Sequence, residues 1–175
     1  NCYAILEARR KVTCAAMPQY REVTAYTDGV KSNAPLAYNG PKSGLPRTKG
    51  AVLNWTNKIG VAGPRVFNEP LRTRKPAVFF VNSMSDLFHQ GVEDEVLKQV
   101  FAIMNKCEHH TFQVLTKRPT RMAQKTRELR LNWTPNIWAG TSIEEDKYAR
   151  PRVRELLKVP ASLRFVSAEP LLGPL

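Results

Sequence analysis

The chain has 175 residues, of which 42% are hydrophobic, so it is long enough for one domain with a substantial core. It contains no apolar run long enough to span a bilayer and no visible secretory leader, which argues against membrane and secreted classes. The net charge is +12, and residues 1–75 contribute +9 of it, with 13 Lys/Arg against 4 Asp/Glu. This basic excess favours a polyanionic partner such as nucleic acid over a charge that only aids solubility.

The cysteines indicate a reducing compartment. Cys2, Cys14 and Cys107 are an odd number with no disulfide-framework spacing, so we expect a cytoplasmic protein and no disulfide bonds. Cys107 follows a helix-like stretch and is expected to be a small buried hydrophobe. The chain does not begin with Met and stops abruptly at Leu175, and we therefore expect it to be a segment of a longer protein.

The first part of the chain lacks regular periodicity. Residues 13–75 are rich in proline, glycine and scattered basic residues. We interpret this stretch as a basic excursion, either packed on the rest of the protein or partly disordered. Trp55 and Phe67 indicate that at least its second half packs against something.

The second part of the chain alternates strands and helices. Apolar runs predict strands, and helical periodicity or helix-start signals predict the segments between them. The predicted strands are 78–82, 111–116, 136–140 and 163–167, and the predicted helices are 93–106, 119–130 and one opened by a capping box at 142–145. Spacings of about 25–35 residues with a helix between are those of consecutive βαβ units. The fold class is therefore α/β, with repeated βαβ units and parallel strands, either open or closed into a barrel.

The stretch 78–89 is the most informative one. The run Val78–Val81 does not alternate, which predicts a strand buried on both faces, and the chain then turns polar at Asn82. The carboxyl ends of parallel strands favour ligand sites, although a strand followed by a turn and a helix cap gives the same pattern.

Polar residues also follow the other predicted strands. Because parallel strands end at the same edge of a sheet, these residues should gather there. They are Asn82, Ser83, Ser85, Asp86 and His89 after the first strand, Thr116, Lys117 and Arg118 after the second, Thr141, Ser142 and Glu144 after the third, and Ser167 and Glu169 after the fourth.

Several of these residues suggest chemistry. Asp86 and His89 are three apart and could form an acid/base pair, but Asp86 as a cap beside a solvated His89 is the stronger interpretation. Lys117 and Arg118 could hold a carboxylate or phosphate, or be a solvated basic pair. Glu169 is extended before a proline and could bind a ligand hydroxyl or amine, or form a structural ion pair. No GxGxxG, P-loop or GxSxG motif supports a nucleotide-binding or hydrolase fold.

Long ordered blocks resemble one family. They are the opening Asn1-Cys2-Tyr3-Ala4 and the blocks at residues 80–89, 110–119, 136–142 and 164–174. These blocks resemble a phage and prophage protein family of unknown function that carries a three-cysteine motif near its N-terminus. The resemblance covers residues 1–4 and most of 76–174, and the middle excursion does not match clearly.

The resemblance implies a cofactor and an architecture. The family's three cysteines resemble those of radical S-adenosylmethionine enzymes, in which thiolates hold an iron–sulfur cluster that binds S-adenosylmethionine. By this resemblance Cys2 is the last of three ligands, and the other two lie upstream of this chain. The implied fold is a partial TIM-type (β/α) barrel, one domain over residues 1–175 that is incomplete at both ends.

The implied site lies at the carboxyl-end rim of that barrel. The residues expected to be catalytic are Asp86, His89, Lys117 and Glu169, and those expected to bind the cofactor are Asn82, Ser83, Thr116, Arg118, Thr141 and Ser142.

Three functions are compatible with these observations. The first is a radical S-adenosylmethionine-like enzyme of phage origin that acts on nucleic acid or a nucleotide. The second is a non-catalytic nucleic-acid-binding module on a (β/α) scaffold. The third is a metal-independent enzyme that uses Lys117 and Arg118 on small phosphorylated substrates. A partner protein is compatible with each of them.

Overall fold

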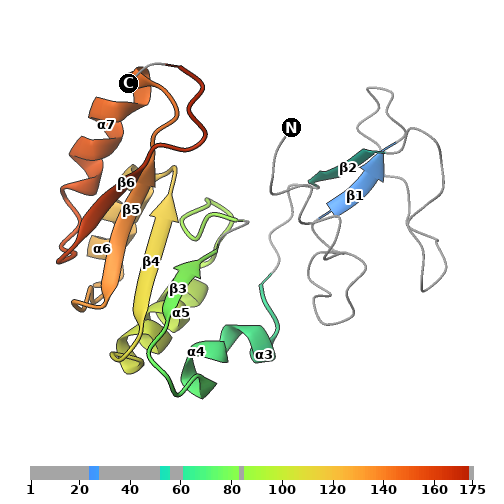
Figure 1. Cartoon of the computed structure of the whole chain (residues 1–175), viewed down its shortest axis with the longest axis vertical. Helices are drawn as coiled ribbons and strands as arrows, with labels where there is room; N and C mark the ends of the chain where they lie inside the picture. Colours follow the sequence, from blue (N-terminus) through green and yellow to red (C-terminus); the bar gives the residue numbers. More distant parts are fainter. Residues whose placement is uncertain (1–23, 28–51, 56–60, 83–84, 174–175) are drawn as a thin grey trace. The chain divides into compact units, whose positions relative to one another are not determined.

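The computed structural model describes residues 24–27, 52–55, 61–82 and 85–173 (Figure 1). The chain divides into two compact units, residues 1–66 and 67–175. In the first unit, β1 (Thr24–Thr27) and β2 (Val52–Trp55) form an antiparallel pair. The short helix α3 (Pro64–Phe67) lies at the boundary. The predicted excursion 13–75 therefore contains two paired strands, and the single-domain organisation stays a prediction.

The second unit is built on a four-stranded sheet in which all strands are parallel. The strands are β3 (Val78–Val81), β4 (Thr111–Thr116), β5 (Ile137–Ser142) and β6 (Arg164–Ser167), in the order β3-β4-β5-β6. Each strand pairs with the next one along the chain, which is the arrangement of consecutive βαβ units. The predicted α/β fold with parallel strands is confirmed. Its closure into a barrel stays a prediction.

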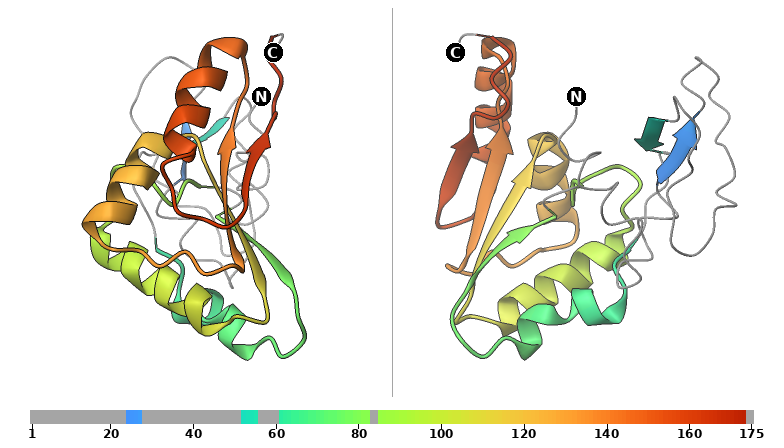
Figure 2. Two further views of the ribbon diagram at one scale, coloured as in Figure 1. Left: turned by 90° about the vertical axis from the view of Figure 1, so that its left-hand side faces the viewer. Right: turned by 45° about the vertical axis from the view of Figure 1, so that its right-hand side comes forward.

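Three helices cover one face of this sheet (Figure 2). They are α5 (Asp94–Lys106), α6 (Pro119–Glu128) and α7 (Asp146–Leu156), while the short α4 (Glu69–Arg72) precedes β3. Acidic Asp94 and Glu95 open α5 and Lys106 closes it, as the helix dipole favours. Pro119 occupies the first turn of α6, where its missing N–H removes no helical hydrogen bond. No helix in the described ranges is long and apolar enough to cross a membrane.

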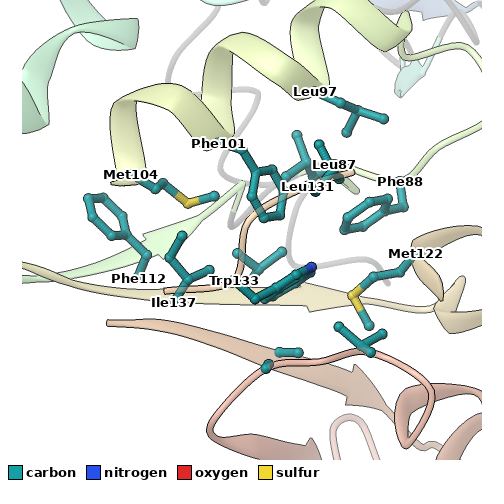
Figure 3. Close-up of a cluster of buried hydrophobic side chains, with 14 of the residues drawn as sticks. Leu87, Phe88, Leu97, Phe101, Met104, Phe112, Met122, Leu131, Trp133 and Ile137 are labelled. Carbon is teal, nitrogen blue, oxygen red and sulfur yellow. The ribbon is translucent and has the colours of Figure 1, made fainter. Parts of the chain in front are cut away.

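The hydrophobic core lies between the sheet and the helices (Figure 3). Helix α5 contributes Leu97, Phe101 and Met104, which share one face of the helix and are buried. The ring of Phe101 meets Trp133 edge to face at a centroid distance of 4.9 Å. Cys107 ends the same helix and is a free, buried thiol, as predicted. Burial raises the pKa of this thiol, which makes it an unreactive apolar side chain.

The opposite face of the sheet is more open. Val78 is 65% exposed and Phe80 is 46% exposed, so the prediction that the first strand is buried on both faces is wrong. This face also carries a close contact between two strands, because the Phe165 ring lies over Gly140. A Cβ added at position 140 would lie 2.3 Å from the ring. A side chain larger than hydrogen at position 140 would therefore displace this ring.

The predicted capping box at residues 142–145 is also wrong. Ser142 is the last residue of β5 and pairs with Ser167, and α7 begins only at Asp146. Glu145 occupies the N-cap position without a side-chain capping bond. Pairing with β6 extends the strand past the point where the local signal would start a helix. This extension brings Glu144 to the edge of the sheet.

Candidate functional site at the carboxyl-end edge of the sheet

The four parallel strands end at a common edge, which we call the carboxyl-end edge. It comprises the residues that end or follow β3 to β6. Several of the polar side chains predicted to gather there form two connected groups. One is centred on Asp86 after β3, and the other on Glu144 after β5.

Asp86 is held by four hydrogen bonds. Its Oδ1 accepts from the Phe88 N–H at 2.9 Å and from the Thr116 hydroxyl at 2.7 Å. Its Oδ2 accepts from the Lys117 N–H at 3.2 Å and from Arg118 Nη1 at 2.7 Å. Both oxygens are therefore engaged, and the carboxylate ties the end of β3 to the end of β4.

The residues after Asp86 anchor it to the core. Leu87 and Phe88 are buried, with exposed fractions of 2% and 0%. The loop after β3 thus inserts two apolar side chains next to a carboxylate, which fixes the position of Asp86. Asp86 itself is only partly buried, so it links the interior with the open surface of the edge.

Thr116 and Thr141 complete the connection between strands. The Thr116 hydroxyl accepts from the Arg118 N–H at 2.9 Å, which orients the backbone at the start of α6. The Thr141 hydroxyl donates to the Thr116 carbonyl at 2.9 Å and is fully buried. Thr141 therefore links β4 and β5 through a buried hydrogen bond. Arg118, in contrast, is 42% exposed.

Glu144 is the most buried charged residue of the edge, with 6% of its side chain exposed. One of its carboxylate oxygens forms an ion pair with Lys117 Nζ, and the other accepts from Arg152 Nη1 at 2.6 Å. Arg152 Nη1 also lies 2.6 Å from the Ser142 carbonyl and donates to it. Burial raises the pKa of the Glu144 carboxyl, but hydrogen bonds from Lys117 and Arg152 outweigh burial and leave the pKa lowered.

This ion-pair group was only partly visible in the sequence. The sequence predicts Glu144 at the rim but not among the catalytic or cofactor-binding residues, and it does not single out Arg152. The sequence signal that could have indicated Arg152 is its position in the second turn of a helix that follows a strand end. Only the packing of α7 against β5 shows that its guanidinium reaches back to Ser142 and Glu144.

Other predicted residues lie apart from this network in the structure. Asn82 follows β3 and has a φ of 59°, a left-handed conformation that asparagine tolerates, and the residue is exposed. His89 accepts from the Gly91 N–H at 3.1 Å through Nδ1, a local contact that does not involve the Asp86 carboxylate. Glu169 is exposed in the segment after β6. Their roles in a site stay predictions.

Two predicted residues, Cys2 and Ser83, lie outside the described residues. Within the described ranges, no group of three His, Cys, Asp or Glu side chains is placed to hold a metal ion. The predicted iron–sulfur ligand at Cys2 therefore stays a prediction.

The arrangement favours an anionic ligand. Three cations (Lys117, Arg118 and Arg152) meet two carboxylates at the edge, and the carboxylates are the more buried partners. Lys117 and Arg118 are 52% and 42% exposed, and each has donors beyond the one engaged with its carboxylate. The less exposed carboxylates thus hold exposed cationic groups in place, which is a preorganised arrangement for a carboxylate or phosphate.

Comparison with known proteins places the chain in a family and adds no functional assignment. The sequence profile of a family described as protein of unknown function matches residues 1–175. The match includes the middle excursion, beyond the blocks that carried the resemblance. No curated protein and no solved structure matches the chain.

Proposed function

The chain belongs to the DUF5131 family of proteins of unknown function, and we propose that it forms part of a radical S-adenosylmethionine-type iron–sulfur enzyme. Its substrate in this proposal is a nucleic acid or a nucleotide. The reaction takes place in the reducing cytoplasm, where cluster thiolates are stable. The phage origin suggested by the resemblance belongs to the same proposal.

The observation that carries the proposal is the cationic carboxyl-end edge. S-adenosylmethionine has a carboxylate and ribose hydroxyls, and nucleotides have phosphates. The exposed donors of Lys117 and Arg118 match the carboxylate and the phosphates, which are the anionic groups of these ligands. Helix α6 also begins directly after Arg118, so its first N–H groups add partial positive charge at the same edge. In this proposal these residues bind and orient the ligand.

The cofactor assignment rests on the cysteine motif. Cys2 and two cysteines upstream of this chain would hold the cluster, which when bound supplies one-electron reductive cleavage of S-adenosylmethionine. Asp86 and Glu144 have both oxygens engaged, so they act here as positioning residues for Arg118 and Lys117. In this proposal Asp86 therefore has a positioning role in place of the predicted catalytic role.

Anaerobic reconstitution of the full-length protein with iron and sulfide tests the enzyme proposal. We expect a brown chromophore and, with a reductant, conversion of S-adenosylmethionine to methionine and 5′-deoxyadenosine. Cys2→Ala should abolish both. A colourless protein that leaves S-adenosylmethionine intact would contradict the proposal.

A second test concerns the edge itself. Lys117→Gln should weaken the binding of S-adenosylmethionine, measured by calorimetry. Lys98→Gln is the matched control because Lys98 is a similarly exposed lysine on α5, outside the edge. Equal binding by the two variants would remove the edge from the proposal.

The alternative of a non-catalytic nucleic-acid-binding module makes a different prediction. Such a module would bind DNA or RNA in a salt-sensitive way, and the binding would survive Cys2→Ala without any cleavage of S-adenosylmethionine. The metal-independent alternative predicts that inorganic phosphate binds at Lys117 and Arg118 in the absence of iron. The reconstitution experiment separates both from the enzyme.

A further inference from the structure

Helix α7 carries a basic surface that the ion pairs of the edge do not use. Lys147, Arg150 and Arg154 are exposed and lie three and four residues apart, so they share one side of the helix. The buried Leu156 lies on the opposite side. We call these three residues the α7 basic stripe.

Two of the three cations have no acidic partner among the residues that the structure describes. Lys147 pairs with Glu145 at 2.8 Å. Arg150 and Arg154 form no ion pair with any residue in the ranges 61–82 and 85–173. Helix α5 differs, because Asp94 and Glu95 balance its two lysines. By net charge, α7 is positive, with four Lys/Arg against two acidic residues, whereas α5 is neutral, although Asp94 pairs with Lys125 of α6.

We infer that the α7 basic stripe binds the phosphate backbone of the nucleic acid on which the proposed enzyme acts. A helix rises about 1.5 Å per residue, so the seven residue steps from Lys147 to Arg154 span about 10 Å. A nucleic-acid strand carries one phosphate per nucleotide, so cations spread over this length can contact neighbouring phosphates of one strand. Charge complementarity of this kind supplies sequence-independent binding.

The neighbourhood of the stripe favours nucleic acid over an anionic membrane. An interfacial helix needs an apolar face to insert, and none of the residues of α7 itself is a large exposed hydrophobic one. The exposed Leu157 and Leu172 lie near opposite ends of the helix and form no such face. Beside the stripe lies the half-buried Tyr148, with Lys147 Nζ 4.9 Å and the Arg152 guanidinium carbon 4.4 Å from its ring centroid. Aromatic rings among cations are typical of nucleic-acid-binding surfaces.

The stripe is continuous with the carboxyl-end edge. Helix α7 begins at Asp146, four residues after β5 ends at Ser142, so Lys147 lies next to the edge. Arg152, from the same helix, reaches Glu144 in the edge network. A strand bound along α7 would therefore be led toward Lys117, which pairs with the same carboxylate. The inference depends on the proposed function only for the identity of this ligand.

The test measures binding of fluorescent single-stranded and duplex oligonucleotides to the full-length protein across a salt series. Arg150→Gln with Arg154→Gln should weaken binding about tenfold and reduce the slope of log K against log salt by about 1.4 to 1.8. The single-stranded and duplex arms show which form the stripe binds. The variant Arg150→Lys with Arg154→Lys keeps the charge and should retain the wild-type slope.

The control is Lys98→Gln with Lys106→Gln, which removes the same charge from α5. An equal loss of binding in this control would show a general charge effect and overturn the inference, as would an unchanged slope in the α7 variant. Binding to anionic lipid vesicles that requires Arg150 and Arg154, without oligonucleotide binding, would also overturn it. Cleavage of S-adenosylmethionine by the α7 variant separates this failure from failure of the proposed enzyme.

Discussion

At the amino-end edge of the sheet, neutral groups join the elements, whereas at the carboxyl-end edge charged groups do so. His110, just before β4, is buried, and its Nδ1 accepts from the Ala77 N–H at 3.2 Å. Its Nε2 donates to the Pro70 carbonyl at 3.1 Å. At the other edge, Asp86 and Glu144 bind cations whose far sides are exposed.

This difference indicates that the His110 network is structural, whereas the network of Asp86 and Glu144 is open to a ligand. Both ring nitrogens of His110 are engaged by backbone groups of the segment that leads into β3, which leaves this residue no capacity for a ligand. Lys117 and Arg118 retain donors that face solvent. Substitutions at the amino-end edge should therefore change stability alone, and those at the carboxyl-end edge should separate stability from binding.

The largest effect is expected for Glu144→Ala. This change leaves Arg152 partly buried without its carboxylate, while Lys117 can turn to water. We expect the free energy of unfolding in urea to fall by about 3 kcal/mol, toward the lower end for breaking a buried ion pair. Glu108→Ala, which removes an exposed carboxylate, is the control and should change the free energy of unfolding by less than about 0.5 kcal/mol. Similar losses in both variants would contradict the buried ion-pair assignment.

His110→Phe should have the next largest effect. Phenylalanine keeps the ring that contacts Phe79 but leaves the Ala77 N–H without its acceptor. We expect a loss of about 2 kcal/mol in unfolding free energy with ligand binding unchanged. His109→Phe, at an exposed neighbour, should cost clearly less. Impaired binding of S-adenosylmethionine by folded His110→Phe would mean that the two edges are not functionally distinct.

The lowered pKa of Glu144 predicts how stability depends on pH. Its folded-state pKa is below the unfolded value, so the stabilisation is fully present above the ordinary glutamate range of about 4.3. It is lost as the pH falls through the folded-state pKa. Chemical unfolding of wild type and Glu144→Gln from pH 7 to 3 should therefore show curves that converge in acid. Parallel curves would show that Glu144 has no depressed pKa.

The smallest effect on stability is expected for Arg118→Gln. Arg118 is 42% exposed, so its ion pair with Asp86 contributes less than about 1 kcal/mol. Binding of S-adenosylmethionine or inorganic phosphate should nevertheless weaken, because an exposed cation is removed from the edge. A variant that loses stability but keeps ligand affinity would place Arg118 with the structural residues.

Much of the fold was determined by the sequence. The apolar runs at residues 78, 111 and 163 and the helical periodicity of 93–106 are local signals, and strands and helices formed at those places. Alternation of strand and helix then predicted parallel pairing, because each helix returns the chain to the edge at which the previous strand began. The gathering of polar strand ends at one edge followed from that geometry.

Tertiary structure alone decided which of these residues meet. The local signal at residues 142–145 favoured a helix start, but pairing with β6 kept Ser142 in the strand. Three of the four hydrogen bonds to Asp86 come from residues about 30 positions away along the chain, at Thr116 to Arg118. Arg152 reaches Glu144 only because α7 packs against β5. A sequence specifies charges and local propensities, whereas which charges become buried together depends on packing between distant segments.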